Sequence, residues 1–204
     1  MPMRNAKKFY RENSIYHVYN RCINAEQLFI NSKSGELFCY LLSRYLCRAK
    51  SSVTNRGTKN YHQRLQLLAF CLMDNHFHLL LFQRDSTAMK EFMQSLAISL
   101  TYYTNLTQHR IGHLLQGVYK ARLVKSDEDL INMSKYIHLN PCGKDLHNRG
   151  LALNYLFSSV SSYLPIGRTT WKFVDTKAIL SHFKGDKREY EEFLLSIDSG
   201  NLGV

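Results

Sequence analysis

The sequence predicts an α+β fold, in which helices pack on an antiparallel sheet and a helical tail follows at the C-terminus. Short runs rich in β-branched and aromatic residues, typical of strands, alternate with longer segments whose apolar residues recur at helical spacing. The order is strand, helix, strand, strand, helix, strand, helix, and a tight turn joins the two adjacent strands. Helices interleaved with an antiparallel sheet are typical of an α+β sandwich.

The first strand and the first helix lie within the first 48 residues. Ile15–Cys22 (IYHVYNRC) predicts a strand from its β-branched and aromatic content. Ser32–Arg48 predicts a helix because its apolar residues share one face: Leu37, Phe38, Leu41, Leu42, Tyr45 and Leu46. Residues 48–64 follow as a loop with five basic residues and no acid. This composition fits either phosphate contacts or a solvated connection.

A hairpin and a second helix come next. Leu65–Met73 and His76–Phe82 predict two strands, because the Asp-Asn pair between them favours a turn. Asp85 or Ser86 is placed to cap a helix that runs to about Leu106. The buried stripe predicted for that helix comprises Met89, Phe92, Met93, Leu96, Leu100 and Tyr103.

Gly117–Lys125 predicts another strand, and a capping signature at Ser126 begins the helix after it. That helix must end by Asn140, since the following proline disfavours helical geometry in the residue before it. The pattern then weakens, with two possible helices in the tail near 175–184 and 186–197.

Charge gives the first indication of function. Lys and Arg total 27 against 16 Asp and Glu, a net charge of +11, which favours polyanions such as nucleic acid. A basic protein without such a partner is the alternative.

Five cysteines without Cys-x-x-Cys spacing favour free thiols over disulfides or a zinc ribbon. The longest apolar stretch is too short to span a bilayer, and the N-terminus lacks a signal peptide. We therefore expect a cytoplasmic protein with no membrane partner.

His76-Phe77-His78 is the most informative tripeptide. Side chains alternate faces along a strand, so the two histidines point the same way and Phe77 points opposite. Two imidazoles on one face suit two ligands of one metal ion. Two ordinary histidines, satisfied within the fold or on the surface, are the alternative.

The helix after Ser126 contributes a tyrosine. At about 100° per residue, Tyr136 clusters with Asp129, Asn132 and Asn140 on a polar face beside the buried one. A tyrosine there can act as a nucleophile toward a metal-polarised phosphate. An amphipathic tyrosine at the margin of the core is the alternative.

These pieces together resemble the single-tyrosine HUH transposases, and most closely the REP-associated tyrosine transposases. Two segments carry the resemblance, Met73–Leu81 (MDNHFHLLL) and Tyr136–Pro141 (YIHLNP). Further similarity lies in Ile15–Arg21, in Gln116-Gly117, in Tyr155–Ser159 and in the segment from Trp171 to Phe183. The resemblance implies a ferredoxin-like HUH sandwich, with residues 1–143 as catalytic domain and 144–204 as a tail that packs on it or extends it.

The resemblance also implies a reaction. Tyr136 would attack single-stranded DNA, and the products would be a 5′-phosphotyrosine link and a free 3′-hydroxyl, at sites near hairpin-forming repeats. His76, His78 and Asn140 would bind Mg²⁺ or Mn²⁺. The family usually has proline where Asp74 stands and tryptophan where Phe157 stands. Other relatives have glutamine in place of Asn140, and the asparagine reaches less far.

Basic residues near these motifs are candidates for contacts with the DNA backbone: Arg21, Lys120, Arg122, Lys125, Arg56 and Lys59. His17 and His138 lie in matching motifs and are assigned structural or hydrogen-bonding roles.

Three other functions remain open from the sequence: a non-catalytic nucleic-acid-binding descendant, a replication initiator or relaxase, and an RNA-binding module. The chain is expected to act as a monomer or a homodimer.

Overall fold

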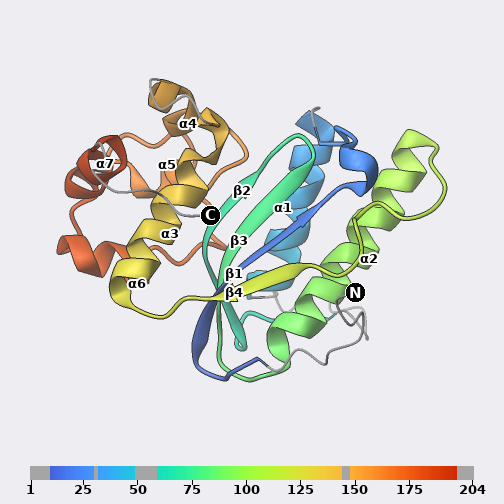
Figure 1. Ribbon diagram of the computed structural model, residues 1–204, viewed down its shortest axis with the longest axis horizontal. Helices are drawn as coiled ribbons and strands as arrows, with labels where there is room; N and C mark the ends of the chain where they lie inside the picture. The colour runs from blue at the N-terminus through green and yellow to red at the C-terminus, as the bar shows by residue number, and fades with distance from the viewer. Residues whose placement is uncertain (1–9, 30–31, 49–58, 144–147, 197–204) are drawn as a thin grey trace, which may run out of the picture.

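A four-stranded antiparallel sheet forms the centre of the molecule (Figure 1). The computed structural model describes residues 10–29, 32–48, 59–143 and 148–196. The strand order is β2-β3-β1-β4, with every neighbouring pair antiparallel. The strands are β1 (Ser14–Arg21), β2 (Leu65–Leu72), β3 (His76–Gln83) and β4 (Lys120–Leu123). The predicted α+β class is therefore confirmed.

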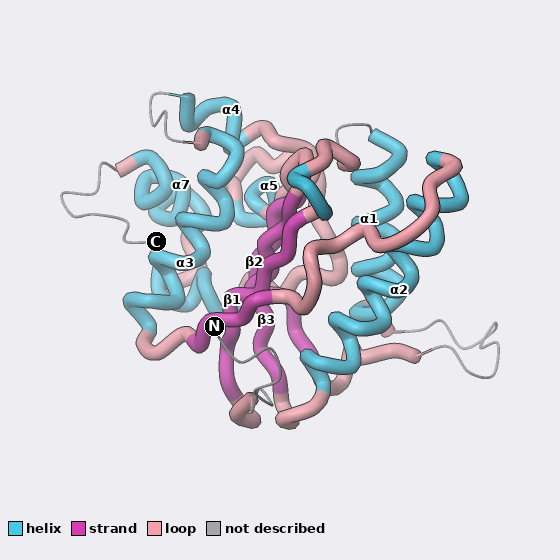
Figure 2. The backbone as a smooth tube through the Cα atoms, turned by 45° about the vertical axis from the view of Figure 1, so that its right-hand side comes forward, coloured by secondary structure: helices cyan, strands magenta, loops and turns pink. Residues whose placement is uncertain are grey.

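Two long helices cover one face of the sheet, α1 (Ser32–Leu46) and α2 (Ala88–Gln108). Figure 2 shows both on one side of the strands, with the remaining helices on the other. The apolar face predicted for each helix supplies this core. Asp85 Oδ1 accepts a hydrogen bond from the backbone N–H of Ala88 at 2.9 Å, so Asp85 caps α2 from outside the helix.

The opposite face carries α3 (Asp127–Leu139) and the C-terminal part of the chain. This part holds α4 (Arg149–Leu153), α5 (Val160–Tyr163), α6 (Lys177–Leu180), a short 3-10 turn at 181–183 and α7 (Lys187–Leu195). Two further 3-10 turns follow β1, at 23–25, and α3, at 140–142. The two helices predicted in the tail correspond to α6 with its 3-10 turn and to α7. Helices α4 and α5 were not predicted.

The tail binds to the outer edge of the sheet. The backbone N–H of Ser159 donates to Phe70 O at 2.9 Å, and that of Asp175 donates to Leu67 O at 2.8 Å. Both acceptors lie on β2, whose other side pairs with β3. The tail therefore covers the β2 edge in addition to part of one face. The division of the chain at residue 143 stays a prediction.

The last strand is shorter than predicted. Gly117 adopts a left-handed backbone conformation with φ +62°, which breaks the extended run. The segment before it still contacts β1, since the backbone N–H of Gln116 donates to Arg21 O at 2.7 Å. The first helix also ends two residues earlier than predicted, at Leu46.

No helix in the described ranges is long and apolar enough to cross a membrane. All five cysteines are free thiols, as their spacing predicted.

Candidate active site

Two histidines of β3 form the floor of the site. The alternation of the strand puts Phe77 against α1, where it is fully buried, and puts His76 and His78 on the α3 face. The two imidazole centroids lie 5.0 Å apart with their planes at 84°. The same-face arrangement expected from the sequence is therefore present.

Helix α3 brings Tyr136 to these histidines. Ser126 caps the helix, and its hydroxyl accepts from the Asp129 N–H at 3.1 Å, as the capping signature predicted. Tyr136 lies nine positions after the first residue of the helix. The centroid of its ring is 5.5 Å from that of the His78 ring, and the two ring planes are at 90°. Burial raises the pKa of Tyr136, so its phenol is protonated at neutral pH.

Asn140 joins the tyrosine to the histidines. It follows the last residue of α3, where the proline after it ends the helix. Burial lowers the pKa of His76, and a side-chain hydrogen bond with Asn140 opposes that shift. A hydrogen bond with the same Asn140 side chain partly offsets the raised pKa of Tyr136. The amide therefore lies within reach of both groups.

His17 and Tyr19, on β1, complete the cluster. His17 Nε2 lies 2.8 Å from His78 Nδ1, which agrees with the hydrogen-bonding role predicted for His17. Tyr19 stacks on both rings, with centroids 5.1 Å from His17 and 5.7 Å from His78. Sequence reasoning missed Tyr19. Alternation along β1 puts it on the same face as His17, but only the register with β3 shows that it reaches His78.

The side chains present fit a divalent metal ion. His78 Nε2 is buried and has no hydrogen-bond partner among the described residues. Burial, followed by the nearby charges of His17 and His76, lowers the pKa of His78 to about 3, so its imidazole is neutral and able to bind a metal. No cluster of three His, Cys, Asp or Glu side chains is arranged for a metal in the described ranges. The Asn140 amide, which lies within hydrogen-bonding reach of His76 and Tyr136, is the predicted third ligand.

Three of the predicted DNA-contacting residues, Arg21, Lys120 and Arg122, lie on strands beside this cluster, and Lys125 precedes α3. Arg21 pairs with His76 across the strands, and Lys120 Nζ lies 5.6 Å from the Tyr19 ring centroid. Arg21, Lys120 and Lys125 are exposed. Arg122 is also exposed, but it forms a bidentate ion pair with Asp129 at 2.8 Å, which already uses its guanidinium. Their contacts with DNA stay predictions.

The last part of the predicted basic loop, residues 59–64, leads into β2 at the other end of the sheet. Lys59 is exposed and precedes β2, whose first residue pairs with Gln83, seven positions along β3 from His76. At about 3.3 Å per residue, the start of β2 lies roughly 23 Å along the sheet from His76. Arg64, in the same loop, is held by Asp85 and Glu91 at 2.8 Å each. Arg56 lies outside the described residues.

His138 lies inside the protein, away from Tyr136. Its Nδ1 is 2.7 Å from the Tyr190 hydroxyl, and its Nε2 is 2.7 Å from Ser159 Oγ. Ser159 Oγ in turn accepts from the Phe70 N–H at 2.8 Å. His138 therefore ties α3 to the tail and the tail to β2, in agreement with the structural role predicted for it.

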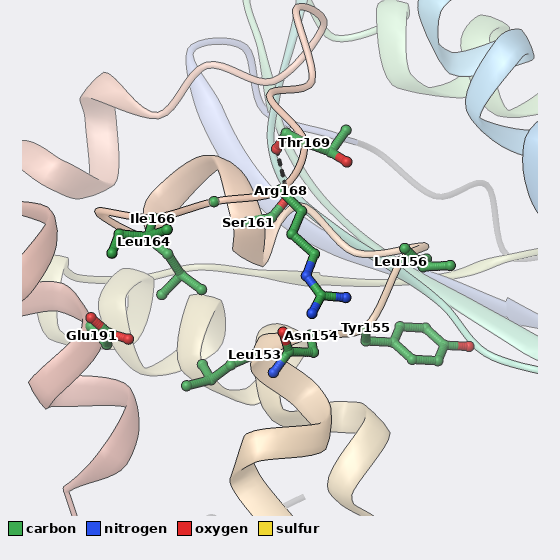
Figure 3. Close-up of a pocket in the computed structure, with 11 residues that line it drawn as sticks. Leu153, Asn154, Tyr155, Leu156, Ser161, Leu164, Ile166, Arg168, Thr169 and Glu191 are labelled. Carbon is green, nitrogen blue, oxygen red and sulfur yellow. Dashed lines mark hydrogen bonds between the residues drawn. The ribbon is translucent and has the colours of Figure 1, made fainter.

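A cavity of about 150 Å³ lies on the tail, lined by residues from α4, α5, α7 and the 164–169 loop (Figure 3). Arg168 extends into it toward Asn154, and Glu191 lies at its rim on α7. None of the predicted site residues lines this cavity.

Comparison with known proteins adds the family. Residues 12–140 match the family described as IS200-like transposases. The match covers more than half of the chain and ends at Asn140. The chain belongs to the IS200-like transposase family. This confirms the predicted resemblance to transposases. No curated protein matches the sequence significantly.

The likeness to a solved structure extends to the fold. The structure of a REP-associated tyrosine transposase bound to a REP hairpin superposes with a TM-score of 0.55 at 13% identity, covering 85% of this chain and 98% of that one. A candidate transposase from Deinococcus radiodurans R1 gives a TM-score of 0.41 at 17% identity, covering 66% of this chain and 95% of that one. The first of these shows a shared fold that includes part of the tail.

Proposed function

We propose that this IS200-like transposase cuts and rejoins single-stranded DNA with Tyr136 as its nucleophile. The supporting observation is that Tyr136, His76, His78 and Asn140 converge from β3 and from the end of α3. Because all four belong to one chain, a monomer has a complete site, although a homodimer is compatible with it.

His76 Nε2, His78 Nε2 and the Asn140 amide oxygen are the groups that would hold Mg²⁺ or Mn²⁺. His76 Nδ1 is already engaged, 2.8 Å from Asn75 Oδ1, which leaves its Nε2 for a ligand. A bound divalent ion would polarise the scissile phosphate and stabilise the charge that develops on it.

Tyr136 would carry the covalent step. Its hydroxyl oxygen attacks the phosphorus and forms a 5′-phosphotyrosine bond, while the bond from phosphorus to the 3′ oxygen breaks. The phenol gives its proton to water, and the departing 3′ oxygen takes one up from water, so no net proton is gained or lost. Because the 3′-hydroxyl of another strand can reverse the step, rejoining needs no external energy source. Asn140 and His78 orient the phenol at this position.

The DNA partner follows from charge and from the structural relative. The net charge of +11 and the exposed Arg21 and Lys120, which lie beside the histidine cluster, favour a DNA backbone at this face. The exposed Lys125, just before α3, would extend this basic surface along the helix. Because the structural relative is bound to a REP hairpin, we propose that the substrate carries a hairpin beside the cleaved strand.

The test is the capture of a covalent adduct. The protein is incubated with a pool of single-stranded oligonucleotides that carry a hairpin and a random flank, with MnCl₂ or MgCl₂, and analysed under denaturing conditions. We expect an adduct with the wild type and with Tyr102→Phe, an exposed tyrosine on α2, and none with Tyr136→Phe.

An adduct that persists in Tyr136→Phe would overturn the assignment of the nucleophile. Binding without an adduct in the wild type would instead identify the second candidate, a descendant that binds DNA but no longer cuts it.

A further inference from the structure

We propose that His17 is a positioning residue, which holds His78 in the tautomer whose Nε2 is free to bind a metal ion. The inference rests on the proposed metal-dependent function, which names the ligands but leaves open what orients them. His17 would act through the 2.8 Å contact between its Nε2 and His78 Nδ1, without binding the ion itself.

The contact between these two nitrogens admits two arrangements of the proton. A hydrogen bond between imidazole nitrogens needs one donor and one acceptor. If His17 donates, the only proton of neutral His78 is on Nε2, which is buried without a partner among the described residues. A buried N–H without an acceptor is unfavourable, and a protonated nitrogen cannot bind a metal. If His78 Nδ1 donates, its Nε2 presents a bare lone pair to the site.

The fold leaves His17 little freedom to turn away. It lies in the middle of β1, between Leu80 of β3 and Arg122 of β4, and only 5% of it is exposed. Its ring stacks on His78 at 16° and on Tyr19 at 21°. The Tyr136 ring closes the remaining side at 5.8 Å and 75°.

The same geometry argues against His17 as a third ligand. Its Nε2 is directed at His78 Nδ1, which is on the side of the His78 ring away from the free Nε2. A metal ligand whose second nitrogen is hydrogen-bonded in this way has a fixed ring orientation and a fixed tautomer. His17 would supply that bond in this protein.

The first experiment reads the tautomer directly, without metal or DNA. Two-bond ¹H–¹⁵N correlation spectra of the full chain distinguish a proton on His78 Nδ1 from one on Nε2. We expect the Nδ1 proton in the wild type and in His17→Gln, whose amide oxygen can accept the same bond. We expect loss of this preference in His17→Phe, which keeps the ring but has no acceptor. The buried His138 serves as an internal reference that should not change.

The second experiment measures Mn²⁺ binding by calorimetry with the same three proteins. We expect binding to weaken about 10–100-fold in His17→Phe, the range seen when such supporting bonds are removed, and to recover in His17→Gln. A wild-type His78 protonated on Nε2, or a His17→Phe variant with unchanged tautomer and Mn²⁺ affinity, would overturn the inference. Failure of the proposed function itself would appear separately, as a wild type that shows the Nδ1 tautomer but forms no DNA adduct.

Discussion

The two faces of the sheet differ in what they bury. The face under α1 and α2 is a continuous apolar core with fully buried residues such as Phe77, Leu79 and Leu81. The other face is mixed. Leu80, Ala69 and Cys71 pack under α3 and the tail, whereas His17, His76 and His78 form a polar cluster beside them. One strand, β3, contributes to both faces because its side chains alternate.

Because of this difference, adjacent residues of β3 can serve different ends: one contributes to the stability of the fold and the next to the chemistry of the site. Phe77 and His78 are neighbours in sequence, yet one lies in the core and the other in the site. Changes at the two positions should therefore affect different measurements, and the comparison can be tested directly.

The largest effect is expected on the polar face. His78→Ala removes a proposed metal ligand, so we expect DNA cleavage to fall on the order of 10⁴-fold, about 5 kcal/mol of transition-state stabilisation. Stability should fall by about 1–3 kcal/mol, less than for the core change below, because the buried His17 Nε2 loses its partner at 2.8 Å, although a buried nitrogen without a partner is also removed. Single-turnover cleavage and urea unfolding measure the two quantities. A variant that cuts at the wild-type rate would contradict the ligand assignment.

The next largest effect is a loss of stability, expected at Phe77, the residue before His78. Phe77→Ala leaves a cavity against Phe38, whose ring lies 5.3 Å away, and should lower the free energy of unfolding by about 3–5 kcal/mol. Urea unfolding measures the loss, with Tyr40→Ala on the exposed side of α1 as the control, expected within about 0.5 kcal/mol. If Phe77→Ala does not fold, Phe77→Leu gives a smaller loss that can be measured. A loss below about 1 kcal/mol would contradict the division between the faces.

The sequence predicts the alternation of side chains along β3, but not the contacts that these side chains make with other strands. Local patterns were enough for the strands, for α1 to α3, and for the side of β3 on which each histidine lies, because these features depend on residues close in the chain. The contact between His17 and His78 depends on the register of β1 against β3, 61 residues apart, which no local pattern contains.

The tail shows the same limit. Helices α4 and α5 have four or five residues each, too few for a periodic pattern, and they are held by contacts with distant elements. Lys135 gives a second example. It is 1% exposed, and its Nζ donates to Ser196 O at 2.9 Å near the end of α7, a burial that helix periodicity does not predict for lysine.

A moderate loss of stability is expected from a change between α3 and the tail, in the apolar part of the second face. The Tyr190 hydroxyl contacts Ser134 Oγ at 3.0 Å and His138 Nδ1 at 2.7 Å inside the protein. Tyr190→Phe keeps the ring but leaves His138 Nδ1 without a partner, so we expect a loss of about 1–2 kcal/mol of unfolding free energy. Thermal or urea unfolding measures it against Tyr102→Phe on the surface. Equal stability of the two variants would show that this network does not hold α3 to the tail.

The smallest effect is expected at the end of the sheet far from Tyr136. The Arg64 guanidinium holds the pKa of Asp85 well below its usual range, and it also lowers the pKa of Glu91. Asp85→Asn keeps the oxygen that caps α2 and removes the ion pair. Because the Asp85 side chain is 40% exposed, we expect a loss of at most about 1 kcal/mol at pH 7.

The pH dependence of this last effect has a definite sign. A carboxylate whose pKa is lowered by folding stabilises the protein above its unfolded pKa, near about 4, and this contribution is lost as the pH falls further. The difference in stability between wild type and Asp85→Asn should therefore be constant from pH 7 to about 5 and should narrow below about pH 4. Urea unfolding at pH 7, 5 and 3 tests this. A difference that stays constant or widens toward acid would contradict the Arg64 ion pair as a stabilising interaction of the Asp85 carboxylate.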